Sequence, residues 1–227
     1  MTPSSTPVQP QSEDGAAKLV SIADGGAPAS ATGGHTHASS KAEVASRAFT
    51  EGFRLLALNV QRLLEGERRR SVVVLSANPK EGRSLAAANL AKSLSEIAPP
   101  VVLIDADPDG SGLNGIRPDI REELWSGPGE RPALQVVAPW FRSGTPERLL
   151  ERVSGLIEEA IDTGATVIVD APACTTSSLG FYLATGVTGV LYVARRRRIK
   201  ESAVHADVRA QLELLGAHVL GVVINEG

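Results

Sequence analysis

The chain of 227 residues is long enough for one substantial domain with an additional tail. Hydrophobic residues make up 42% of it and aromatic residues only 4%, a composition that is typical of a soluble globular protein. The net charge of −3 gives no general reason to expect binding to nucleic acid. The single cysteine, Cys174, excludes an internal disulfide and favours a reducing, cytoplasmic location.

Membrane and export signals are not evident in the sequence. No run of about 18 apolar residues is present, so we expect no direct insertion into a membrane. The N-terminus has no basic segment followed by an apolar core, and we therefore expect no secretory signal. Any recruitment to the inner face of a membrane would have to come from a partner.

The first 41 residues are rich in Ser, Thr, Pro, Gly and Ala, and this composition predicts a disordered tail. Residues 42–227 are predicted to form a single domain. It begins with a helix over residues 42–64, in which apolar side chains recur three or four residues apart and predict one buried stripe.

A strand, a turn and a helix follow one another around residues 72–94. The apolar run of residues 72–75 predicts a buried strand, and an alanine-rich helix follows the turn. A phosphate-binding loop has this context and the consensus G-x-x-x-x-G-K-S/T. Gly82 and Ser84 match that consensus, whereas Ala77 and Arg83 replace its first glycine and its lysine. Taken alone the match is weak, and a plain turn between strand and helix explains it equally well.

Carboxylates follow two further apolar strands. Asp105 and Asp107 come directly after the run of residues 101–104, and Asp170 ends the run of residues 167–169. In α/β sheets the carboxyl ends of parallel strands are where ligands bind. Next to a phosphate loop, such carboxylates can hold Mg²⁺ and activate a nucleophile. The alternative for the first pair is a helix cap and a turn aspartate.

The remaining elements complete an α/β pattern. Strands are predicted at residues 133–139, 187–193 and 219–224, and helices at residues 145–161 and 201–215. Residues 110–131 are predicted to be a loop. Four arginines at positions 195–198, with Lys200, suggest either contact with phosphate or an acidic partner, or a solvated helix start. We expect a three-layer α/β/α fold with a mainly parallel sheet.

Several ordered motifs resemble the BY-kinase family of bacterial tyrosine kinases, within the ParA/MinD-like P-loop ATPases. The similarity covers residues 51–225. Residues 51–59 resemble the helix motif E-x-F-R-x-L-R-T-N, 76–84 resemble the loop motif S-S-x-P-G-E-G-K-S, and 88–91 resemble the A-N-L-A that follows it. Residues 102–108 resemble L-I-D-A-D, 167–172 resemble I-I-D-T-P-P, 189–193 resemble D-G-V-L-L-V, and 220–225 resemble L-G-V-V-L-N.

The resemblance implies a P-loop NTPase fold, ATP and Mg²⁺ as cofactors, and a role in capsule or exopolysaccharide biosynthesis. It implies a polysaccharide co-polymerase membrane protein as partner, and possible homo-oligomers. It assigns catalysis to Asp105, Asp107 and Arg83, and Mg²⁺ to Ser84, Asp105 and Asp170. The nucleotide would contact the following residues: Ala77, Asn78, Pro79, Lys80, Glu81, Gly82, Arg83, Ser84, Leu85 and Asn225, the last at the adenine.

Departures from the family pattern put the activity in doubt. Arg83 stands at the catalytic lysine, and a planar guanidinium does not replace a compact ammonium in a tight loop. Lys80 stands at a glycine, where its side chain could crowd the loop or supply the missing ammonium. Ala57 replaces an arginine of the oligomerisation helix. The only tyrosines, Tyr182 and Tyr192, lie in apolar segments, so no tyrosine-rich tail is present for autophosphorylation.

Three interpretations remain open at this point. The intact acids favour an ATP-dependent tyrosine kinase or ATPase that tolerates arginine. Arg83, Lys80 and Ala57 favour a non-catalytic, pseudokinase-like module that docks on a membrane co-polymerase. A ParA/MinD-like partitioning ATPase is disfavoured because Asn78 occupies the position of that class's signature lysine.

Overall fold

The structure is a computed structural model of the chain, and it describes residues 18–22, 37–107, 112–113, 133–137, 145–199 and 203–226. Its elements in chain order are β1 (Lys18–Ile22), α1 (His37–Leu63), β2 (Ser71–Ser76), α2 (Arg83–Ile97), β3 (Val101–Asp105), β4 (Leu134–Val137), α4 (Pro146–Asp162), β5 (Thr166–Asp170), α5 (Leu179–Gly186), β6 (Gly189–Arg195), α6 (Arg196–Ile199), α7 (Ala203–Leu214) and β7 (Val219–Asn225).

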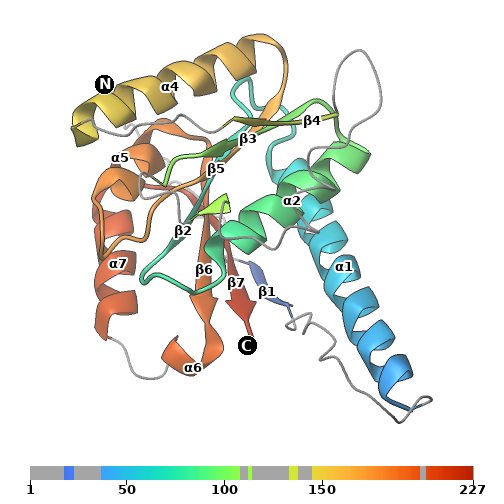
Figure 1. Cartoon of the computed structure of the whole chain (residues 1–227). Helices are drawn as coiled ribbons and strands as arrows, with labels where there is room; N and C mark the ends of the chain where they lie inside the picture. The colour runs from blue at the N-terminus through green and yellow to red at the C-terminus, as the bar shows by residue number, and fades with distance from the viewer. Residues whose placement is uncertain are drawn as a thin grey trace, which may run out of the picture.

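The strands form one sheet in the order β1-β7-β6-β2-β5-β3-β4, and every pair is parallel. Parallel neighbours need crossover connections, which the helices provide on both faces of the sheet (Figure 1). β2, β3 and β5 are buried along their whole length, as continuous apolar strands in such sheets should be. The predicted α/β/α architecture is confirmed.

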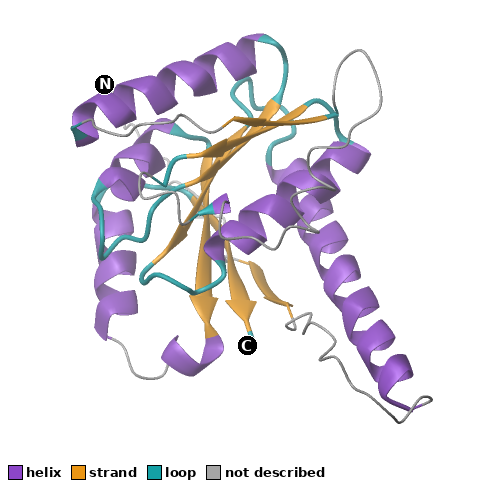
Figure 2. Ribbon diagram, in the orientation of Figure 1, coloured by secondary structure: helices purple, strands orange, loops and turns teal. Residues whose placement is uncertain are grey.

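Alternate residues of the central strand, β2, face two separate cores. Helices lie on both faces of the sheet (Figure 2). Val72 and Val74 of β2 pack into the core that α1 and α2 cover. Val73 and Leu75 pack into the core that α4, α5 and α7 cover. The sheet is therefore sandwiched between helical layers, and the edge where its strands end stays available for a site.

The N-terminal region departs from the expected tail. β1 lies within it and extends the sheet by pairing with β7, and α1 begins at His37 rather than at residue 42. Leu, Val and Ile give the short segment of β1 strand propensity that the composition of the whole tail conceals. Without β1, the edge of β7 would present unpaired backbone groups.

Two short helices, α5 and α6, were not predicted as such. α5 spans only eight residues and follows Ser178, so its apolar stretch gives little periodic signal. α6 agrees with the alternative of a helix start for the arginine cluster. Most of the expected loop at residues 110–131 lies outside the described residues, as do Pro108 and Lys200.

Candidate functional site

Register in the sheet brings the predicted carboxylates together. β3 pairs with β5 so that Asp105 stands opposite Asp170, each at the carboxyl end of its strand. β2 lies next to β5, and the loop that follows it leads directly into α2. The predicted phosphate loop and acids therefore share one edge of the sheet, where α/β folds bind ligands.

The loop between β2 and α2 has the backbone turn that a phosphate loop requires at its last glycine. Gly82 has a φ of 90°, and a Cβ there would lie 2.4 Å from Asn225 Nδ2. Asn225 Nδ2 donates to the carbonyl oxygen of Glu81 at 3.2 Å. Gly82 is thus required for its conformation and for the close approach of β7. Asn225 lies against the loop, while its suggested contact with adenine stays a prediction.

Arg83 turns its guanidinium into the acidic cluster. Its Nε donates to Asp170 Oδ1 at 2.8 Å, and one terminal nitrogen donates to Asp107 Oδ2 at 3.1 Å. All three side chains are almost inaccessible to solvent, with 8%, 0% and 7% exposure respectively. The planar fork of arginine suits such a double contact, which a compact ammonium would not make in the same way.

Asp105 is engaged by backbone donors. Asp107 N–H donates to its Oδ1 at 3.1 Å, and Leu113 N–H donates to its Oδ2 at 3.2 Å. Gly112 lies so close that a Cβ there would be 2.8 Å from Asp105 Oδ1. Burial, and secondarily the charge of Asp170, raises the pKa of Asp105 to about 6 despite these hydrogen bonds. Asp105 therefore also performs the turn role considered as the alternative.

Asp170 is completely buried at the end of β5. Burial raises its pKa, while the charge of Arg83 and a hydrogen bond from Ser84 act in the opposite direction. Its Oδ2 has no hydrogen-bond partner among the described residues. This oxygen is therefore a buried carboxylate atom without a hydrogen-bond partner in the described part of the chain.

A Mg²⁺ ion fits this arrangement poorly. Arg83 already bridges two of the acids, and both oxygens of Asp105 accept backbone hydrogen bonds. Within the described ranges, no group of three or more His, Cys, Asp or Glu side chains is placed to hold a metal ion. Magnesium prefers an octahedral set of oxygen ligands, and a neighbouring guanidinium opposes it electrostatically.

A buried polar chain behind the loop was not anticipated from the sequence. The carboxylate of Glu81, with no solvent exposure, accepts hydrogen bonds from the backbone N–H and the side-chain amide of Asn78, both at 3.2 Å. His205 Nε2 lies 3.3 Å from Glu81 Oε1, and His205 Nδ1 shares a 2.7 Å hydrogen bond with the Tyr192 hydroxyl. A buried glutamate needs such partners. The available sequence signal was a charged residue, Glu81, inside the predicted phosphate loop.

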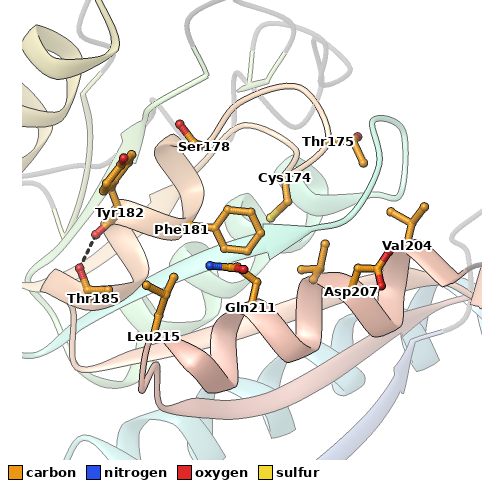
Figure 3. Close-up of a pocket in the computed structure, with 11 residues that line it drawn as sticks. Cys174, Thr175, Ser178, Phe181, Tyr182, Thr185, Val204, Asp207, Gln211 and Leu215 are labelled. Carbon is orange, nitrogen blue, oxygen red and sulfur yellow. Dashed lines mark hydrogen bonds between the residues drawn. The ribbon is translucent and has the colours of Figure 1, made fainter.

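Residues 174 and 175 support the start of the loop from the other side. Cys174 N–H donates to Ser76 O at 3.0 Å, and Thr175 bonds Ala77 O through both its N–H and its hydroxyl. The same two residues line a cavity of about 520 Å³ between α5 and α7, where Phe181 also lies (Figure 3). The cavity lining includes none of the predicted nucleotide or metal residues, although it adjoins the segment that holds the loop.

Comparison with solved structures places the fold among bacterial tyrosine kinase domains. The kinase domain of the Escherichia coli tyrosine kinase ETK is 20% identical, with a TM-score of 0.62 over 78% of this chain and 75% of that one. The chimerical protein CapA2B2 is 23% identical, with a TM-score of 0.59 over 77% of this chain and 83% of that one. The predicted resemblance and P-loop fold are confirmed.

A curated relative adds a sequence match. The succinoglycan biosynthesis transport protein ExoP of Rhizobium meliloti (strain 1021) is 29% identical over 196 residues. These residues cover 78% of this chain and 25% of ExoP, so the chain spans about a quarter of that relative. No protein-family model matches the chain.

Proposed function

We propose that this chain, which has the fold of bacterial tyrosine kinase domains, is a kinase-like module of exopolysaccharide production that does not transfer phosphate. The observation that carries the proposal is the double contact of Arg83 with Asp107 and Asp170. The guanidinium of Arg83 therefore lies between two acids. The resemblance assigns catalysis to Asp107 and Mg²⁺ to Asp170.

The two ion pairs of Arg83, with Asp107 and Asp170, are called the Arg83 lock below. They should be costly to break. Removing the guanidinium from a buried pair leaves Asp170 charged and without its counter-ion, a change that typically costs about 3–5 kcal/mol. A Mg²⁺ ion on Asp170 would have to displace the guanidinium and compensate for the contacts that Arg83 then loses. Nucleotide binding by the loop backbone is compatible with the lock, whereas magnesium-dependent phosphoryl transfer is not.

The assignment to exopolysaccharide production rests on ExoP, whose name denotes succinoglycan biosynthesis transport. The present chain matches a quarter of that protein, and we propose that it works with a membrane co-polymerase as a docking module. None of the described helices combines the length and apolar character needed to cross a membrane. The proposed site of action is the cytoplasmic face of the membrane, reached through this partner.

Self-association through α1 is also part of the proposal. Leu55 and Leu58 on α1 are 55% and 53% exposed, whereas Ala57 is fully buried against the domain. The position at which the family has a second arginine therefore faces inward here. Any homo-oligomer would use apolar contacts of α1 in place of that charge.

An active kinase or ATPase is the second candidate, and the acids favour it. Asp105 has a pKa of about 6, which suits proton transfer near neutral pH. The buried Oδ2 of Asp170, which has no hydrogen-bond partner among the described residues, is a further acceptor for this candidate. This candidate requires Arg83 to leave the cluster when nucleotide binds.

Calorimetry with ATP and Mg²⁺ on wild type, Arg83→Lys and Arg83→Lys/Asp170→Asn separates the candidates. We expect Arg83→Lys to bind Mg–ATP about tenfold more tightly than wild type, because lysine releases the acids. The added Asp170→Asn change should remove that gain. We also expect no transfer of labelled phosphate by wild type to itself or to a tyrosine polymer. Tight, Asp170-dependent binding and turnover by wild type would establish the active enzyme instead.

A further inference from the structure

An unusual lysine, Lys80, lies on the exposed part of the predicted phosphate loop, residues 79–80, which is called the loop crest below. Lys80 has a φ of 64° and is the one non-glycine residue with positive φ among those described. An L side chain rarely adopts this conformation, and departures of this kind cluster at functional sites. The side chain is exposed and has no ion pair or hydrogen bond within the described part of the chain.

A second cation is attached to the same crest. Arg198 of α6 donates from one terminal nitrogen to the carbonyl oxygen of Pro79, the residue before Lys80, at 3.1 Å. α6 follows β6, and β6 is paired with β2, so the arginine cluster lies at the same edge of the sheet as the loop (Figure 1). A guanidinium has five N–H donors, and the contact with Pro79 uses only one of its nitrogens.

These two charges are not neutralised by acids of the chain. Arg196 pairs with Glu226, and Arg83 pairs with Asp107 and Asp170. For Lys80 and Arg198, by contrast, no acidic partner exists among the residues that the structure describes. Two uncompensated cations therefore stand on the solvent side of a loop that leads into the positive end of α2.

We infer that Lys80 and Arg198 form a two-cation site that binds a polyphosphate group without a divalent cation. The ammonium is a compact donor and the guanidinium a planar one, and both make charge-assisted hydrogen bonds to phosphate oxygens. The inference rests on the proposed function in one respect: Arg83 must keep the acids from holding Mg²⁺.

Magnesium then acts as a competitor at this site. The ion neutralises the phosphate oxygens that the two cations would bind, and the closed acidic cluster offers no compensating contact. Polyphosphate binding should weaken when Mg²⁺ is added. A nucleotide site of the kind that the family resemblance implies would respond in the opposite direction.

The test is calorimetry with ATP and with inorganic pyrophosphate, each in EDTA and in excess Mg²⁺. The main variant is Lys80→Gly/Arg198→Ala, in which glycine also suits the positive φ. Arg62→Ala/Arg68→Ala is the matched control, since it removes two positive charges from exposed residues before β2, at the opposite end of that strand. Lys80→Arg/Arg198→Lys keeps both charges and shows whether the donor geometry matters.

We expect wild type to bind both probes in EDTA, and the main variant to bind them at least about tenfold more weakly. The control should bind like wild type, and Mg²⁺ should weaken binding. Equal affinity for ATP and pyrophosphate would identify the phosphates as the recognised group, whereas stronger ATP binding would add a contact to the nucleoside. Absence of binding in EDTA, or equal loss in the control, overturns the two-cation site but leaves the Arg83 lock intact. Binding that requires Mg²⁺ and Asp170 overturns both.

Discussion

His205 on α7 lies with its Nε2 3.3 Å from Oε1 of Glu81, a buried carboxylate inside the loop between β2 and α2. The other ring nitrogen is hydrogen-bonded to Tyr192 on β6. Helix α7, strand β6 and the loop are thereby joined through three polar side chains in an otherwise apolar layer. Nε2 of His205 makes no hydrogen bond among the described residues, so its link to Glu81 is one of proximity, between the loop and a helix far from it in sequence.

The first prediction concerns this chain of contacts. We expect His205→Ala to lower the free energy of unfolding by about 1–3 kcal/mol, because Glu81 then lacks one of its buried partners. Urea denaturation measures the loss. In the Glu81→Gln background, His205→Ala should lower the free energy of unfolding by less than it does in wild type. Equal losses in the two backgrounds would show that the two residues do not interact.

The second prediction concerns Arg83. Arg83→Met removes the counter-ion of a fully buried aspartate, and we expect a loss of about 3–5 kcal/mol at neutral pH. Asp170→Asn should recover part of this loss in the double variant, since no buried charge then remains at position 170. Denaturant unfolding of the four proteins gives the coupling energy, and a value near zero would contradict the ion pair.

The pH dependence of stability tests Asp105. Its pKa is about 6 in the folded chain, against an ordinary value of 3.8, so the folded state binds this proton more tightly. The stabilisation is complete below about pH 4 and is lost as the pH rises through 6. Between pH 4 and 7 we expect wild type to lose up to about 3 kcal/mol relative to Asp105→Asn. Parallel stability curves for the two proteins would refute the raised pKa.

The contact between Gly82 and Asn225 leads to a fourth prediction. Gly82→Ala should destabilise the chain by about 2 kcal/mol or more, because φ is 90° and the new Cβ would lie 2.4 Å from Asn225 Nδ2. In an Asn225→Ala background the steric part should disappear and the backbone part remain. Thermal or urea unfolding of the cycle distinguishes the two contributions, and an unchanged cost would exclude the steric one.

Cys174 offers a probe of the segment that supports the loop. Burial raises the pKa of its thiol to about 12 from 9.0, so little thiolate is present at pH 8. We expect a disulfide reagent to label the folded chain about a thousandfold more slowly than the urea-unfolded chain. Since Cys174 is the only cysteine, one absorbance trace reports it. Comparable rates in both states would contradict the buried thiol.

Much of the fold was predictable because it depends on local patterns. β-branched runs such as Val72 to Val74 produce buried strands, and strands alternating with helices leave a parallel sheet as the compact solution. The position of Asp105 and Asp170 at strand ends follows directly, as does their meeting at one edge. β1 escaped prediction because its five residues are stabilised by pairing with β7 rather than by their surroundings in the sequence.

The sequence by itself determined the α/β/α class, the resemblance to bacterial tyrosine kinases and the position of Asp105 and Asp170 at the ends of strands. Those properties depend on residue type, spacing and order. Only the tertiary structure decided the direction of the Arg83 guanidinium, which depends on the ends of β3 and β5 meeting beside α2. The same holds for the histidine behind Glu81 and the arginine above Pro79. Such partners come from distant segments, and sheet register and helix packing bring them within hydrogen-bonding range.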